Sequence, residues 1–231
     1  MQNNLSNDYV DLGLPSGTWW AKRNIGATRP DDYGMFFSHK SLFEKGGNAA
    51  NQYIIKLDRD GRNTGGLPTA SREPLSVVLS QFWPELLGIP TEQQVRELLE
   101  ECQWTWICLH DSRTVGYRVT SKRNNNEIIL PAAGWYNETI LKEIAVDMKY
   151  YELGYITRLE LLNKLFDFEY KHHCGVFSNP SARYLIHRTY QPLAPLGLTG
   201  GSQVLQFDSK SHKTATIPAN IWMPIRPVIC P

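Results

Sequence analysis

The chain has 231 residues, of which 42% are hydrophobic, with 24 basic and 23 acidic side chains. This length favours one large domain, and the hydrophobic content excludes a disordered chain. The near balance of charge and the lack of a long basic run argue against nucleic acid as a partner. Because no apolar run approaches the ~20 residues of a membrane-spanning helix, we expect no transmembrane segment.

The first eight residues are polar and lack the basic and apolar regions of a signal peptide. We therefore expect a flexible lead over residues 1–8 and no signal peptide in this chain. The cysteines do not indicate a compartment, because no two of them form a CxxC pair. They stand at Cys102, Cys108, Cys174 and Cys230.

Short strands are predicted at the start of the chain. Residues 9–14 alternate in polarity, and 18–21 resume a strand after the turn Pro15–Gly17, which together predict a hairpin. A second turn at 30–34 leads into the apolar residues 35–37.

The clearest predicted helix runs from Thr91 to Cys102. Thr91 and Gln94 have the spacing of a capping box. The predicted apolar face consists of Val95, Leu98, Leu99 and Cys102. We expect Cys102 to be a core residue rather than a reactive thiol. Residues 104–108 then alternate as a strand, which places Trp104 and Trp106 on one face.

A second hairpin is predicted around the Asn-rich turn at 124–126. Residues 116–121 alternate on one side of this turn, and the apolar run Ile128–Leu130 follows on the other. Because the run is continuously apolar, we expect a strand that is buried on both faces. Nearer the C-terminus, 204–207 is a candidate strand. Residues 221–228 predict a closing strand that its prolines confine to an edge or a bend.

Several of these segments together resemble a known family. The matching segments are residues 10–17, 20–21, 24–28, 32–34, 37, 102–106, 116–122, 129–134 and 225–228. In order and approximate spacing they resemble the Fibrobacter succinogenes major paralogous domain (FISUMP), a family common in Bacteroidetes. The resemblance covers roughly half of the chain. It departs at 87–91, where Leu-Gly-Ile-Pro-Thr replaces the family's Trp-Arg-Met-Pro-Thr.

The resemblance implies an α+β fold of the C-type-lectin-like class, in the branch of the formylglycine-generating enzyme. Such a fold has a twisted, mostly antiparallel sheet, packed helices and long loops, with its N- and C-terminal strands together. The family's aromatic-Trp-Ser-Ser strand has two candidates here, residues 154–157 and 174–178. The resemblance also suggests a secreted or cell-surface protein.

Two further helices are predicted in the second half of the chain. Apolar residues have helical spacing at 138–150. Thr157 and Glu160 have the spacing of a capping box, and apolar positions follow them up to about 170. We therefore expect residues 9–231 to form a single FISUMP-like domain with a helical insertion at about 138–200. Local packing is the plainer role of these helices, and a docking surface for a partner is the alternative.

We expect no metal and no cofactor. Asp58–Gly61 resembles part of a calcium loop, but Lys56 and Leu67 would occupy its first and last ligand positions. The neighbouring residues of His172–Cys174 would point to opposite faces of a strand, which disfavours joint coordination of a metal ion.

The sequence contains no GxSxG, HExxH, P-loop or dinucleotide motif. With the resemblance and an aromatic-rich composition, this favours a non-catalytic recognition domain for a glycan or a protein. The alternatives are a structural module of a surface assembly or fibre and an enzyme of the formylglycine-generating type. The predicted ligand contacts, chosen because Tyr and Arg often anchor interfaces, are Arg183, Tyr184, His187, Arg188 and Tyr190. Covering the insertion is the alternative role of these residues.

Overall fold

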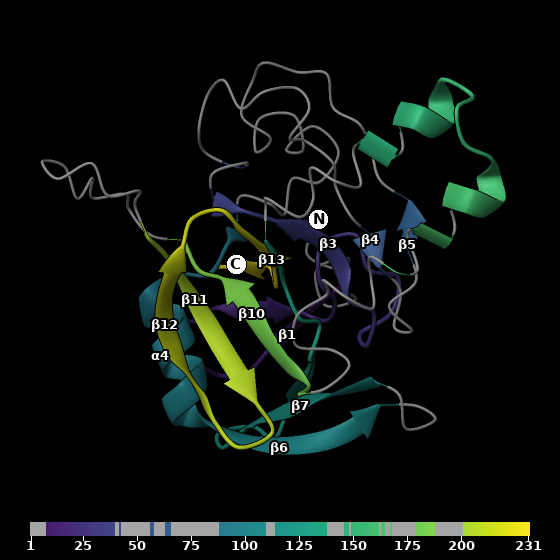
Figure 1. Cartoon of the computed structure of the whole chain (residues 1–231). Helices are drawn as coiled ribbons and strands as arrows, with labels where there is room; N and C mark the ends of the chain where they lie inside the picture. Colours follow the sequence, from purple (N-terminus) through teal and green to yellow (C-terminus); the bar gives the residue numbers. More distant parts are fainter. Residues whose placement is uncertain are drawn as a thin grey trace, which may run out of the picture.

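The computed structural model of the chain is a mixed α and β structure, built mostly from small antiparallel sheets (Figure 1). The structure describes residues 8–39, 42, 56–57, 63–65, 88–109, 114–137, 146–147, 149–161, 163–164, 167, 179–187 and 201–231. The predictions for 1–7, 58–61 and 172–174 lie outside these residues. No helix in the described ranges is long and apolar enough to cross a membrane.

The two ends of the described chain pair in one sheet. Strand β1 (Tyr9–Asp11) is antiparallel to β2 (Trp19–Ala21), and β14 (Val228–Ile229) pairs with the other side of β2. The backbone N–H of Ala21 also donates to the carbonyl of Pro227 at 2.9 Å. The predicted hairpin is confirmed, and the opening and closing strands lie together as expected.

A second sheet joins β6 (Cys102–Leu109), β7 (Thr114–Ser121) and β8 (Glu127–Pro131), with β7 in the middle. Asn125 takes a φ of 60° in the turn before β8, which Asn tolerates better than most residues. The predicted hairpin is therefore confirmed. Burial on both faces of β8 is wrong for Ile129, which is half-buried, because it lies opposite Arg118 on the exposed face of the sheet, whereas Ile128 and Leu130 point to the buried face.

Helix α4 (Glu92–Glu101) begins with the predicted capping box, in which Thr91 and Gln94 each bond the other's backbone N–H. Val95 and Leu98 of its apolar face are buried in the core. Cys102, which follows the helix, is also buried, and this burial raises the pKa of its thiol to about 11. The predicted helix and the core position of Cys102 are confirmed.

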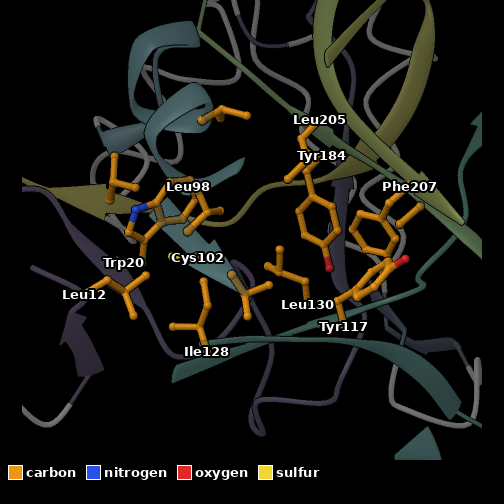
Figure 2. Packing of buried hydrophobic residues seen from close by; sticks show 14 of the residues in the cluster. Leu12, Trp20, Leu98, Cys102, Tyr117, Ile128, Leu130, Tyr184, Leu205 and Phe207 are labelled. Carbon is orange, nitrogen blue, oxygen red and sulfur yellow. The ribbon is translucent and has the colours of Figure 1, made fainter. Parts of the chain in front are cut away.

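The central sheet joins β10 (Ser181–Leu185), β11 (Gly201–Asp208) and β12 (His212–Pro218) in that order. It separates two apolar cores, because alternate side chains of its strands point to opposite faces. Tyr184 and Phe207 belong to the first core, which α4 and the β6–β8 sheet complete (Figure 2). Leu185 and Val204 belong to the second core.

The second core is covered by a sheet in the order β5-β4-β3-β13-β9. Its strands are β3 (Gly34–Phe37), β4 (Lys56–Leu57), β5 (Asn63–Gly65), β9 (Tyr136–Asn137) and β13 (Ile221–Pro224). The predicted closing strand is divided: Pro224 ends β13, and Pro227 precedes β14 in the sheet of the chain ends. The predicted bend at the prolines is confirmed, because a proline cannot donate to a strand ladder.

Arg226 lies in this bend and is 1% exposed. Its Nε donates to Oδ1 of Asn24 at 2.8 Å, and its Nη1 donates to the carbonyl of Ala21 at 3.0 Å. Its Nη2 donates to the carbonyl of Ile129 at 2.7 Å. Burial lowers the pKa of Arg226 to about 10, and the nearby Tyr184 offsets part of this lowering. One buried guanidinium therefore joins the opening segment, the closing segment and β8.

Asn24 extends these contacts to the central sheet. Its Nδ2 donates to the hydroxyl of Tyr184 at 3.2 Å and to the carbonyl of Tyr33 at 2.9 Å. The Tyr184 hydroxyl in turn donates to the carbonyl of Pro131 at 2.9 Å. We call Arg226, Asn24 and Tyr184 the buried polar node.

The described residues of 146–152 and 158–167 are helical, and they lie at one side of the molecule (Figure 1). The predicted capping box is present: Thr157 N–H donates to the Glu160 carboxylate at 2.7 Å, and Glu160 N–H donates to Thr157 Oγ1 at 3.2 Å. Residues 154–157 form a turn, so they are not the aromatic-Trp-Ser-Ser strand that the resemblance implies. The other candidate, 174–178, lies outside the described residues.

Candidate functional site

The predicted ligand contacts do not form one described cluster. Arg183 and Tyr184 are neighbours on β10 and therefore point to opposite faces of the sheet. Arg183 is half-buried, and its guanidinium carbon lies 3.9 Å from the ring centroid of Trp135. This is a cation–π contact, worth roughly 0.5–1 kcal/mol at an exposed site.

Tyr184 differs from the prediction, because it is 2% exposed and leaves no ring face for a ligand. Its ring stacks on Phe207 with centroids 5.8 Å apart, and burial raises the pKa of its hydroxyl. His187 is exposed, and its backbone N–H donates to the carbonyl of Pro90 at 2.8 Å. Arg188 and Tyr190 lie outside the described residues.

The structure instead gathers aromatic side chains between the β6–β8 sheet and the central sheet. We call this cluster the aromatic layer, and it consists of Trp104, Trp106, Tyr117, Phe207 and His212. Alternation on β6 places both tryptophans on one face, as predicted. In the structure this face meets the central sheet at Phe207. Tyr117 and Phe207 form its buried floor, close to Tyr184 (Figure 2).

Edge-to-face contacts hold these rings in place. The ring of Tyr117 lies 5.3 Å from that of Trp104, 5.0 Å from that of Trp106 and 5.4 Å from that of Phe207, all T-shaped. Such pairs contribute roughly 0.5–1.5 kcal/mol each beyond their buried area. The Trp104 indole N–H also donates to the carbonyl of Leu98 at 3.2 Å. Contacts within the protein therefore fix the orientation of these rings in the structure, which contains no ligand.

One margin of the layer faces solvent. Trp104 and Trp106 are half-buried, whereas His212 is exposed. The imidazole of His212 stacks on Trp104 with centroids 4.6 Å apart and an interplanar angle of 7°. We call these three side chains the aromatic rim. Such a rim offers apolar area with fixed ring orientations, which suits the binding of a planar or apolar group.

Asp208 adds a carboxylate near the rim. Its Oδ1 accepts the backbone N–H groups of Lys210 and Ser211, each at 2.8 Å. The bond from Lys210 is the main cause of its lowered pKa, so the group is anionic at neutral pH. Burial, and then the charge of Asp208, raise the pKa of the Tyr117 hydroxyl. The site thus combines apolar rings with one hydrogen-bond acceptor.

Other features of the described residues are less suited to binding a ligand. A groove along the outer face of α4 is lined by Glu92, Gln93, Arg96, Glu97 and Glu100, all from this helix. Among the described residues, no group of three or more His, Cys, Asp or Glu side chains could hold a metal ion. The described cysteines are free. None of these places combines as many side chains from separate elements as the aromatic layer does.

The sequence indicated only half of the aromatic layer. The alternation in 104–108 placed the tryptophans together, but Phe207 and His212 come from a hairpin about a hundred residues later. The predicted strand at 204–207 was the only signal for that hairpin. No local pattern shows that Phe207 and His212, on either side of the turn of this hairpin, meet Trp104.

No protein-family model matches the chain, and no curated protein or solved structure matches it.

The pH dependence of stability tests the His212 stack. Burial lowers the pKa of His212, so the folded state favours the neutral imidazole. As the pH falls through about 6.5, the His212 side chain of the unfolded chain takes up a proton before that of the folded chain does. The stability that the neutral imidazole contributes above this pH is therefore lost as the pH falls to the pKa of the folded state. His212→Phe keeps a stacked ring without this titration. Between pH 7 and pH 5, the wild type should therefore lose more free energy of unfolding in urea than His212→Phe. Equal losses would contradict the partial burial of the His212 imidazole in the folded state.

Proposed function

We propose that the chain is a non-catalytic recognition domain with a C-type-lectin-like fold of the FISUMP type, which binds a glycan or a protein at its aromatic rim. The observation that carries the proposal is the rigid, half-exposed pair Trp104 and Trp106 with His212 beside it. Large aromatic side chains frequently anchor interfaces, because they provide much contact area at little cost in conformational entropy.

The fold supports the same proposal at a coarser level. The structure has a helix packed against small antiparallel sheets, and the opening and closing strands share a sheet. Both features agree with what the family resemblance implies. A recognition role on the outer surface of a cell, or after secretion, fits that resemblance. The strands that carry the rim supply a rigid support for binding.

Two neighbouring residues on β6 test the proposal. Wild-type protein is screened on a glycan array and against a library of random peptides displayed on phage, and the dissociation constant of the best binder is measured. Trp106→Ala should weaken this binder at least tenfold, which corresponds to about 1.4 kcal/mol. Thr105→Ala, on the opposite and exposed face of β6, should change it less than twofold.

Circular dichroism and urea unfolding establish that both variants are folded. Loss of binding in both variants, or in neither, would contradict a ligand site at the rim. A screen that yields no binder at micromolar concentration from either source would contradict the recognition role itself.

A second function, a structural module in a surface assembly, is favoured by a separate observation. The described residues of 146–161, which form two helical pieces and the turn between them, expose large apolar side chains within a short segment. These are Val146, Tyr150, Tyr151, Leu153, Tyr155 and Leu159, with exposed fractions from 42% to 73%. Exposed apolar clusters of this kind mark interaction surfaces in monomeric proteins. We call this cluster the exposed helical patch.

Sedimentation tests the assembly hypothesis. If the patch mediates self-association, the average mass of the wild type should rise with concentration, and Tyr155→Ser with Leu159→Ser should abolish the rise. Glu152→Ser, an exposed polar change in the same segment, should leave it in place. A wild-type protein that stays monomeric at high concentration would contradict this function and leave the aromatic rim unaffected.

A further inference from the structure

Strand β12 forms one edge of the central sheet, and among the described residues no strand pairs with its outer side. The other edge of that sheet is covered: the N–H of Gly134 donates to the carbonyl of Ser181 at 3.0 Å, and Gly134 bridges to Ala182 on β10. The two edges of the central sheet therefore differ. No described strand pairs with the outer side of β12, although helix α4 contacts this strand.

Two backbone bonds identify the groups that face outward. The N–H of Asp208 donates to the carbonyl of Ser211 at 2.9 Å, which fixes the alternation of bonds between β11 and β12. The N–H of Ile186 donates to the carbonyl of Gln203 at 3.1 Å, so Gln203 bonds to the strand on the other side of β11. Its neighbours on β11 must then bond to β12, which is the same alternation.

It follows that Lys213, Ala215 and Ile217 direct their backbone groups to β11. The residues between them, His212, Thr214 and Thr216, direct their N–H and C=O groups away from the sheet. The side chains of these three residues are exposed, so solvent reaches this edge.

Natural proteins usually blunt such an edge, because a free strand edge is a template for another strand. They use very short strands, prolines, bulges or several charges. β12 has 7 residues, its only proline is at its end, and it carries one lysine. Its register with β11 runs from His212 to Pro218 without a shift. The edge is therefore long and regular enough to pair.

We propose that the β12 edge binds an extended peptide segment of a partner protein, which adds to the central sheet as a further strand. This inference rests on the proposed recognition function and names its ligand class. The alternating N–H and C=O groups at Thr214 and Thr216 match another peptide backbone and no other common ligand. The imidazole of His212 already stacks on one face of the Trp104 ring, so a sugar ring cannot stack on that ring face.

The aromatic rim and a lysine would select the side chains of the peptide. His212 begins β12 and also belongs to the rim, so a peptide side chain on that face would lie next to the rim. Lys213 points to the opposite face, is exposed, and forms no ion pair among the described residues. An acidic peptide residue beside Lys213 would form a favourable cross-strand pair, worth roughly 0.2–1 kcal/mol.

The test uses a substitution that removes one outward N–H. Peptides are selected from the phage-displayed random library, and the strongest is synthesised and titrated against the full chain. Thr214→Pro deletes the N–H that would donate to the peptide, and an edge strand tolerates proline at such a position. Thr214→Val keeps that N–H and a β-branched side chain. We expect Thr214→Pro to weaken the peptide at least tenfold and Thr214→Val to weaken it less than twofold.

Hydrogen exchange on the unsubstituted protein gives a second measurement that does not depend on how Thr214→Pro folds. Saturating peptide should slow amide exchange at Thr214 and Thr216 at least tenfold. An unchanged exchange rate at both amides would overturn the inference.

The outcomes separate this inference from the proposed function. Peptide or glycan binding that Trp106→Ala abolishes but Thr214→Pro leaves intact would overturn strand addition and retain recognition at the rim. Binding that neither substitution weakens would overturn both. A glycan as the only ligand found would also overturn strand addition.

Discussion

The arrangement of the described sheets depends on one buried cation. Arg226 places a guanidinium where three segments meet, and its three acceptors are neutral oxygens of Asn24, Ala21 and Ile129. Moving such an ion out of water costs several kcal/mol, which only well-placed hydrogen bonds can offset. Because no acceptor cancels the charge, each one is needed. The chain ends and β8 are therefore held in a single relative position.

The node also links the fold to the proposed function. Through Asn24 it fixes the hydroxyl of Tyr184, whose ring stacks on Phe207 at the floor of the aromatic layer. Phe207 in turn contacts Tyr117, so the position of β11 relative to β7 follows from the node. Side chains that are already held in their binding orientation lose less conformational entropy on binding than mobile side chains do.

Much of the local structure could be predicted from sequence, because its causes are local. Turn residues gave both hairpins, and the spacing of Thr91 and Gln94 gave the start of α4. The buried polar node could not be predicted, since nothing near position 226 shows that Asn24 will accept its Nε. Tyr184 was expected to contact a ligand because Tyr often does, yet it lies on β10 with its side chain in the first core.

A double-mutant cycle on Asn24 and Arg226 tests the central claim most directly. Asn24→Ala and Arg226→Lys are measured singly and together by urea unfolding. If the two side chains act as one node, either change alone already removes their bond, so the double variant should be less destabilised than the sum. The account predicts a coupling of at least about 1 kcal/mol, as found for contacting residues in one network. Additivity within about 0.5 kcal/mol would contradict it.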